Sequence, residues 1–396
     1  MKIRASLFFL FLLIVPAAGR DIDLDRIYLN KSYPFYHQLL NYRLEAYRRS
    51  GARFIDRNTI FVHWLSANQL IYLKEFSSAT VIYRYDLRKS SRREIGRLTG
   101  TVTTSSLTNN GRFLVCKILY LSRDSLPYQK LCIVNCASGK IQYRTSNFPF
   151  KDYSHSPSGS GIIQEGKRGF FQFYPSAGIH RLLLPRKKYI SHLATLNPRI
   201  LLLSPDRLKK LVIAGSGGSY RSLLLSGTGI KKIADISSSR ETCWLNNEEI
   251  IYRTGYSGRY SVKINNIVTD KTITLIKNTL NSGIAVSRET GLISFLDNQV
   301  IAIYPYRKGV PVCTGLEGDD ISFSPSASRF ATLLYGKCFI VRHTTLLRRL
   351  PSVKSQVILL QGLYRKLQHS KKYHINSYSS EYCRKKIQSY SRCIHQ

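Results

Sequence analysis

A repeated unit of about 43 residues fills the chain between residues 53 and 350. A polar turn recurs at intervals of 42, 49, 48, 41, 42 and 37 residues, following residues 65, 107, 156, 204, 245, 287 and 324. Four short strands per repeat of this length are typical of propeller blades. One blade cannot bury both of its faces alone, so the array must be long and closed. The sequence therefore predicts an all-β propeller with seven four-stranded blades across 53–350, with six or eight blades as alternatives.

The turns share a residue pattern. Three are proline-containing tripeptides in which proline pre-sets φ: Ser156-Pro157-Ser158, Ser204-Pro205-Asp206 and Ser324-Pro325-Ser326. An apolar strand follows each turn, as at 211–214. These residues resemble the TolB-type, WD-repeat-like β-propeller family, whose blades carry a Ser-Pro-Asp-Gly turn followed by a Lys-x-Ile-Ala-Phe-like strand. Residues 204–214 fit best, and the resemblance covers about 300 of the 396 residues. It implies the fold and says little about function.

The first residues of the chain have the pattern of a secretory signal peptide. Lys2 and Arg4 precede an unbroken apolar run at 7–15, and small residues follow at 17–19. A charged start, a short apolar centre and small residues at the end define such a peptide. A buried N-terminal strand or helix is the alternative. We expect residues 1–19 to be a signal peptide and the protein to be exported, either periplasmic or secreted.

Residues 20–52 are expected to form an N-terminal strand and helix. Ser32 is a capping residue for a helix that runs to Arg49 with apolar side chains on one face. The last blade is one strand short in the repeat pattern, and we expect the apolar segment 26–29 to supply that strand and close the ring, since open sheet edges invite aggregation. The helix at 33–49 should pack on the propeller, because its apolar stripe cannot stay in water.

Residues 351–396 are expected to form a basic helical tail. Apolar side chains recur at helical spacing from 353 to 367 and again from 383 to 394. Between residues 348 and 396 there are eleven Lys or Arg and one acid, Glu381. We expect the 353–367 helix to pack on the propeller or on the N-terminal helix.

The positive charge is the strongest signal outside the repeats, because 60 Lys and Arg face 23 Asp and Glu, a formal net charge of +37. Basic clusters attract polyanions, so anionic glycans, cell-wall polymers and phospholipid headgroups are candidate ligands. Export argues against nucleic acid as the natural ligand. A generally basic surface without a specific ligand is the alternative. The candidate anion-binding residues lie in a loop and in the tail: Arg186, Lys187, Lys188, Lys371, Lys372, Arg384, Lys385 and Lys386.

The eight cysteines allow few disulfides. Cys132 and Cys136 are about 13 Å apart if they lie on one strand, whereas a bridge needs Cα atoms within about 7 Å. Cys116 and Cys132 can pair if they face each other across a hairpin. The alternative is that most of the eight are buried free thiols. The chain has no C-x-x-C motif, so zinc or thioredoxin-type chemistry has no support.

The sequence contains no nucleophile elbow, H-E-x-x-H, Walker or dinucleotide-binding pattern, so it assigns no catalytic, cofactor-binding or metal-binding residue. His155 lies beside a blade turn, where we expect it to make a structural hydrogen bond. Glu317, Asp319 and Asp320 form the main acidic cluster, either a solvated turn or, less readily, a calcium site.

Two classes of function remain. The first is a non-enzymatic exported propeller that scaffolds a protein partner in the cell envelope or outside the cell and docks on an anionic polymer or membrane surface. The second is a propeller enzyme of the lyase or glycosidase type with its site at the channel mouth. An enzyme would need titratable side chains from different blades to meet near the axis. We favour the first class, because the acids are few and widely spread.

Overall fold

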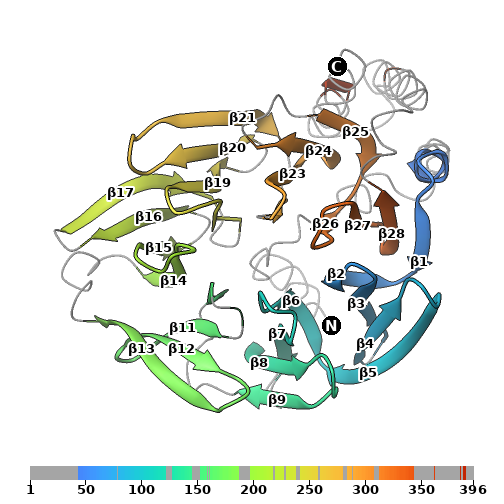
Figure 1. Ribbon diagram of the computed structural model, residues 1–396, viewed down its shortest axis with the longest axis horizontal. Helices are drawn as coiled ribbons and strands as arrows, with labels where there is room; N and C mark the ends of the chain where they lie inside the picture. Colours follow the sequence, from blue (N-terminus) through green and yellow to red (C-terminus); the bar gives the residue numbers. More distant parts are fainter. Residues whose placement is uncertain are drawn as a thin grey trace, which may run out of the picture.

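The computed structural model describes residues 43–342, together with 361, 384, 387 and 388, and has gaps at 78, 122–126, 145–151, 158, 160, 187–196, 217–218, 227–228, 238–240, 257–258, 280–282, 288 and 307–311. The described residues form seven four-stranded antiparallel sheets around a central axis (Figure 1). The prediction of an all-β propeller with seven blades is therefore confirmed, and six and eight blades are excluded.

Blades 1 to 3 each use four consecutive strands. Blade 1 consists of β2 (Thr59–Ser66), β3 (Gln69–Glu75), β4 (Ala79–Asp86) and β5 (Ser91–Thr99). Blade 2 consists of β6 (Thr101–Leu107), β7 (Phe113–Leu121), β8 (Pro127–Asn135) and β9 (Ile141–Arg144). Blade 3 consists of β10 (Tyr153–His155), β11 (Ile162–Gly166), β12 (Gly169–Tyr174) and β13 (Ile179–Pro185).

Blades 4 to 6 repeat this plan. Blade 4 consists of β14 (Pro198–Leu203), β15 (Lys210–Ser216), β16 (Ser219–Ser226) and β17 (Gly229–Ile236). Blade 5 consists of β18 (Cys243–Trp244), β19 (Glu249–Tyr256), β20 (Arg259–Asn266) and β21 (Thr272–Thr279). Blade 6 consists of β22 (Ile284–Ser287), β23 (Leu292–Asp297), β24 (Val300–Pro305) and β25 (Val312–Glu317).

Blade 7 closes the ring with strands from both ends of the propeller. Its first three strands are β26 (Asp320–Phe323), β27 (Arg329–Leu334) and β28 (Lys337–Arg342), and its fourth is β1 (Arg53–Asp56). Figure 1 shows β1 beside β28, and Arg53 pairs with Ile340. We expected 26–29 to supply this strand, and that prediction is wrong. The segment directly before blade 1 takes the place, while 26–29 lies outside the described residues.

The predicted turns all connect the first and second strands of their blades. A shared hydrogen-bond pattern explains why Ser or Thr recurs there. The backbone N–H of Ser204 donates to the carbonyl of Lys209 at 3.0 Å, and the Ser204 hydroxyl accepts the Lys209 N–H at 2.9 Å. Thr108 and Phe113 repeat this exchange, as do Ser324 and Arg329. The side chain thus adds a second hydrogen bond across a turn that the backbone closes with only one.

The hydrophobic core is divided among the junctions between neighbouring blades. Ile71 of blade 1 and Val102 and Leu114 of blade 2 are fully buried in one such cluster. Ile251 of blade 5 and Phe295 of blade 6 belong to another. The outer strands are far more exposed, as in the first four residues of β5. Each blade is therefore held by its neighbours, as expected of a closed array.

A short helix at 43–49 packs against the propeller, as predicted for the part of the N-terminal helix that the structure describes. Ala46 and Tyr47 are buried against side chains of blades 6 and 7, and the Tyr47 ring stacks on Phe339 at 4.4 Å. Arg43 forms an ion pair with Glu317 at 2.8 Å, and both side chains are 1% exposed. Residues 353–367 lie outside the described residues apart from 361, so their packing stays a prediction.

The acidic cluster divides in two: Asp319 is exposed, as expected of a solvated turn, whereas Glu317 is buried, and among the described residues the three acids do not form a group that could hold a metal ion. Glu317 is buried with Arg43, and its backbone carbonyl accepts a hydrogen bond from the Tyr47 hydroxyl. The carboxylate of Asp319 accepts the N–H of Tyr335 at 3.0 Å, while that of Asp320 accepts the N–H of Ile321 at 2.8 Å. These acids hold the helix and blade 7 in place.

Five cysteines in the described part of the chain are free: Cys116, Cys132, Cys136, Cys243 and Cys338. Cys116 and Cys132 are direct partners across β7 and β8, as the hairpin alternative required, yet no bond joins them. Burial raises the pKa of Cys132 to about 12, so the protonated thiol dominates at neutral pH. These thiols act as core side chains.

Candidate functional site

A polar cluster spans the innermost strands of blades 1, 2 and 3. Nε2 of His63 on β2 lies 2.7 Å from the Ser105 hydroxyl on β6. The neighbouring Ser106 hydroxyl lies 2.7 Å from Nε2 of His155 and 2.8 Å from the Tyr153 hydroxyl, both on β10. Successive residues of one strand point to opposite faces of the sheet, so β6 contacts blade 1 through one serine and blade 3 through the next. The expected structural hydrogen bond of His155 is confirmed.

Both histidines are neutral at physiological pH. Burial, with a smaller contribution from the nearby His155, lowers the pKa of His63 to about 4. Burial also lowers the pKa of His155 to about 4. A neutral imidazole has one donor and one acceptor nitrogen, so each ring can exchange a hydrogen bond with its serine without carrying charge. Nδ1 of His155 is buried without a hydrogen-bond partner.

A neutral imidazole beside a hydroxyl is the smallest pair that activates a nucleophile. Such a pair also needs a third group to orient the base, and no carboxylate among the described residues contacts His63 or His155. The nearby carboxylate of Asp152 is instead paired with Lys117 at 2.8 Å, and both side chains are largely buried. Titratable groups from different blades therefore meet, but they join blades through hydrogen bonds and an ion pair.

The predicted anion-binding residues fall largely outside the described residues. Arg186 follows β13, is exposed, and donates its backbone N–H to the carbonyl of Arg168 at 2.8 Å. Arg384 is helical and exposed. The remaining six are Lys187, Lys188, Lys371, Lys372, Lys385 and Lys386, which are not described. Their role in anion binding stays a prediction.

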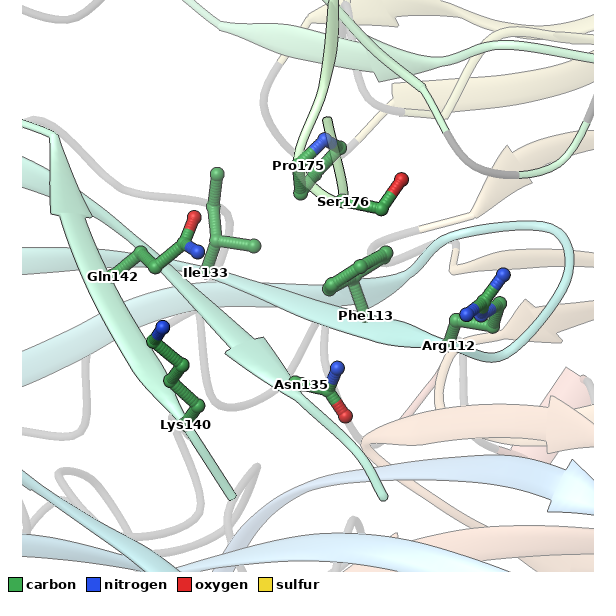
Figure 2. A pocket seen from close by; sticks show the side chains of 8 residues that line it. All are labelled: Arg112, Phe113, Ile133, Asn135, Lys140, Gln142, Pro175 and Ser176. Atoms are coloured by element: carbon green, nitrogen blue, oxygen red, sulfur yellow. The ribbon is translucent and has the colours of Figure 1, made fainter. Parts of the chain in front are cut away.

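A cleft of 230 Å³ lies between blades 2 and 3, on the end of the propeller where the turns between first and second strands emerge (Figure 2). Its walls combine apolar and polar side chains: Arg112, Phe113, Ile133, Asn135, Lys140, Gln142, Pro175 and Ser176. In Figure 2, Pro175 and Ser176 of blade 3 face residues of blade 2. The Asn109 side-chain amide donates to the Ser156 carbonyl at 2.9 Å and ties the two blades together beside the cleft.

The cleft is electropositive. Arg112 and Lys140 are exposed, and neither side chain has a hydrogen-bond or ion-pair partner among the described residues. The Asn135 side-chain oxygen accepts the N–H groups of Ala137 and Ser138, at 3.0 and 3.1 Å. Its amide nitrogen is left as a donor. None of the eight lining residues is acidic. The cleft therefore offers cations and donors to a ligand rich in acceptors.

Sequence reasoning missed this cleft because it searched for runs of basic residues. Arg112 and Lys140 are isolated cations in separate turns, and only the blade geometry brings them to one junction. The repeat pattern could have indicated this site, because the turns that carry Arg112 and Lys140 belong to the same repeat and both lie beside the next one.

No described group of three or more His, Cys, Asp or Glu side chains is arranged to hold a metal ion. Within the same part of the chain, none of the helices has the length and apolar character that crossing a membrane requires.

No family model and no curated protein matches the sequence, but solved structures do match the fold. An oligogalacturonate lyase in complex with manganese is 10% identical and matches 76% of this chain and 93% of its own, with a TM-score of 0.51. A chain of the mitotic checkpoint complex is 11% identical and matches 73% and 90%, also with a TM-score of 0.51. TolB from Acinetobacter baumannii is 17% identical and matches 55% and 54%, with a TM-score of 0.39.

Likeness at these identities concerns the fold alone. The resemblance of the blade turns to TolB-type, WD-repeat-like propellers is confirmed at that level, since the chain forms seven four-stranded antiparallel blades. The similar structures include an enzyme and a member of a protein complex, so the fold is compatible with either kind of function.

Proposed function

We propose that the protein is an exported, non-enzymatic propeller that scaffolds a protein partner in the cell envelope or outside the cell. The observation that carries this proposal is a contrast in how polar groups are used. His63 and His155 are held by serines of a neighbouring blade, whereas the cations of the cleft are exposed and have no partner within the described part of the chain. Groups already engaged between blades stabilise the fold, and unengaged groups are available to a partner.

Export rests on the predicted signal peptide at 1–19. It is tested by producing the full-length chain with a C-terminal epitope tag and fractionating the cells. We expect the mature chain, shortened by its leader, in the envelope or medium. Full-length chain confined to the cytoplasm would exclude export.

Scaffolding is tested by cross-linking the tagged chain in living cells and quantifying the co-purified proteins. We expect a partner that co-purifies in a fixed ratio to the propeller, and that retrieves the propeller when it is tagged in turn. A variant that lacks 43–56 should lose the partner, because the ring can no longer close. Absence of a partner in both directions would contradict the proposal.

The alternative is a lyase or glycosidase with its site at the channel mouth, and one observation favours it. His63 and His155 are only half-buried, and each lies 2.7 Å from a serine hydroxyl. Turnover of acidic polysaccharides by the purified chain, abolished by His63→Gln and His155→Gln, would support this alternative. We expect no turnover.

An anionic glycan or membrane surface is a second candidate partner, and the basic tail would contact it. Each Lys or Arg near an anionic bilayer contributes about 1 kcal/mol, and the effect decays over about 8–10 Å. Changing Arg384, Lys385 and Lys386 to Ser should therefore weaken retention on heparin and sedimentation with anionic liposomes, and flatten the salt dependence. Unchanged retention in both assays would mean that these charges are merely solvated.

A further inference from the structure

We propose that the cleft between blades 2 and 3 binds an acidic segment of the partner protein, with one apolar side chain in the cleft and carboxylates on either side of it. This inference rests on the proposed scaffold function and names the chemistry of the partner. The cleft has the three properties that such a segment requires: a fixed shape, an apolar floor and cations at its edges.

The shape is fixed by backbone hydrogen bonds. The carbonyl of Arg112 accepts the N–H of Cys136 at 2.9 Å, and the carbonyl of Lys140 accepts the N–H of Asn135 at 2.9 Å. Across the junction, the N–H of Asn110 donates to the carbonyl of Gly159 at 3.3 Å. The turns that carry both cations are therefore held in place before a ligand arrives, which reduces the entropy lost on binding.

The floor is apolar and contains no exposed aromatic face. Phe113 and Ile133 are 4% and 1% exposed, and Pro175 is also buried. An apolar side chain that entered the cleft would itself leave water, and burial of that kind is favourable. A sugar ring usually packs on an open aromatic face, which Phe113 does not offer, so a peptide fits this floor better than a glycan.

The edges carry charge and donors. Figure 2 shows Arg112 and Lys140 on opposite sides of Phe113. Asn135 presents its amide nitrogen, because its oxygen is used by its own turn. A ligand with carboxylates on both sides of an apolar residue would meet a cation at each edge, and a basic or neutral segment would gain nothing there.

The experiment measures binding of the full-length protein to a short fluorescein-labelled peptide with a central leucine flanked by glutamates. The matched peptides replace glutamates by glutamines, or leucine by serine. We expect measurable affinity for the first peptide only. Arg112→Gln with Lys140→Gln should weaken binding by about tenfold or more, since each exposed charge pair accounts for up to about fivefold.

The control variant is Lys89→Gln with Arg93→Gln. It removes the same net charge from exposed positions of blade 1, and neither side chain forms a hydrogen bond or ion pair with a described residue. We expect it to bind as the wild type does. Equal loss in both double variants would show that the peptide senses only net charge, and would overturn the proposal.

Ser176 provides a test in which the sign of the effect reverses. Its side chain is exposed at the blade 3 wall. Ser176→Glu should weaken peptide binding by several fold and Ser176→Lys should preserve or strengthen it, whereas a purely steric effect would weaken both. Loss in both variants would contradict the proposal. A second result would also contradict it: the leucine and serine peptides bind equally well, and an acidic oligosaccharide displaces both. That result would make the cleft a glycan site.

Failure of this inference is separable from failure of the scaffold function. If the wild type and the variant Arg112→Gln with Lys140→Gln retain the cross-linked partner equally, the scaffold function is supported and the cleft proposal is contradicted. If wild type captures no partner, the scaffold function itself falls, whatever the peptide does.

Discussion

The closure region, residues 43–56, and the junction between blades 2 and 3 use charged side chains in opposite ways. In the closure region Arg43 is buried against Glu317, and Asp56 on β1 accepts Lys74 of blade 1 at 2.9 Å. At the other junction, Arg112 and Lys140 are exposed and have no partner among the described residues. Paired, buried charges hold parts of this molecule together, and unpaired, exposed charges leave a surface available to something else.

The comparison separates stability from binding. Breaking a buried ion pair leaves one charge in a medium of low dielectric constant, whereas removing an exposed charge changes little in the folded chain. Variants of the closure region should therefore affect unfolding, and variants of the cleft should affect partners.

The largest effect is expected for Arg43→Ala, which leaves Glu317 buried without its counter-ion. The expected loss in free energy of unfolding is about 3–5 kcal/mol. The measurement is urea unfolding followed by tryptophan fluorescence. Arg43→Ala with Glu317→Gln should recover part of this loss, because the second change removes the stranded charge.

The matched control is Arg48→Ala on the same helix, where the side chain is 80% exposed and 3.6 Å from Glu45. Its loss should stay within about 0.5 kcal/mol. If the two alanine variants unfold at the same urea concentration, the Arg43–Glu317 pair does not hold the helix as described.

An intermediate effect is expected from His63 and His155 of the polar cluster, and it depends on pH. Their pKa values are lowered to about 4 in the folded chain, against about 6.5 when unfolded. Between these values the unfolded state binds more protons, so stability falls as pH falls from about 6.5 to 4. His63→Gln with His155→Gln should remove this loss, so that stability changes less between about pH 6.5 and 4 in the double variant than in the wild type.

The readout is the midpoint of urea unfolding at a series of pH values. His180→Gln, at an exposed position on β13, provides the control and should leave the curve of the wild type intact. If the double variant lost as much stability at low pH as the wild type does, groups other than these two histidines would cause the loss.

The smallest effect on stability is expected for Arg112→Gln with Lys140→Gln. Since neither side chain has a described partner, the free energy of unfolding should change by less than about 0.5 kcal/mol. Thermal unfolding measured by circular dichroism tests this. A substantially lower Tm would show that the two cations stabilise the blade junction, and the contrast with the closure region would be lost.

The blades could be predicted because the residues that form each turn and strand lie close together in the sequence. Ser204 and Asp206 close their turn within a few residues, and the same chemistry recurs at Thr108 and Ser324. Periodic turns and short strands then fix the number of blades.

The closure was only partly predictable. Residues 53–56 read as the start of blade 1, and their pairing with β28 joins segments at opposite ends of the propeller. Glu317 was misjudged for the same reason, since its partner Arg43 is remote in the sequence. The cleft depends on two single cations from different turns, so only the assembled ring identifies it.

The most direct test of the account compares partner binding by two double variants with that of the wild type. One is Arg112→Gln with Lys140→Gln in the cleft, and the other is His63→Gln with His155→Gln in the polar cluster. Binding of the cross-linked partner would be measured by titration at neutral pH. The account predicts that the cleft variant loses affinity and that the histidine variant retains it. Loss of binding in the histidine variant alone would contradict it and would place the functional site at the channel.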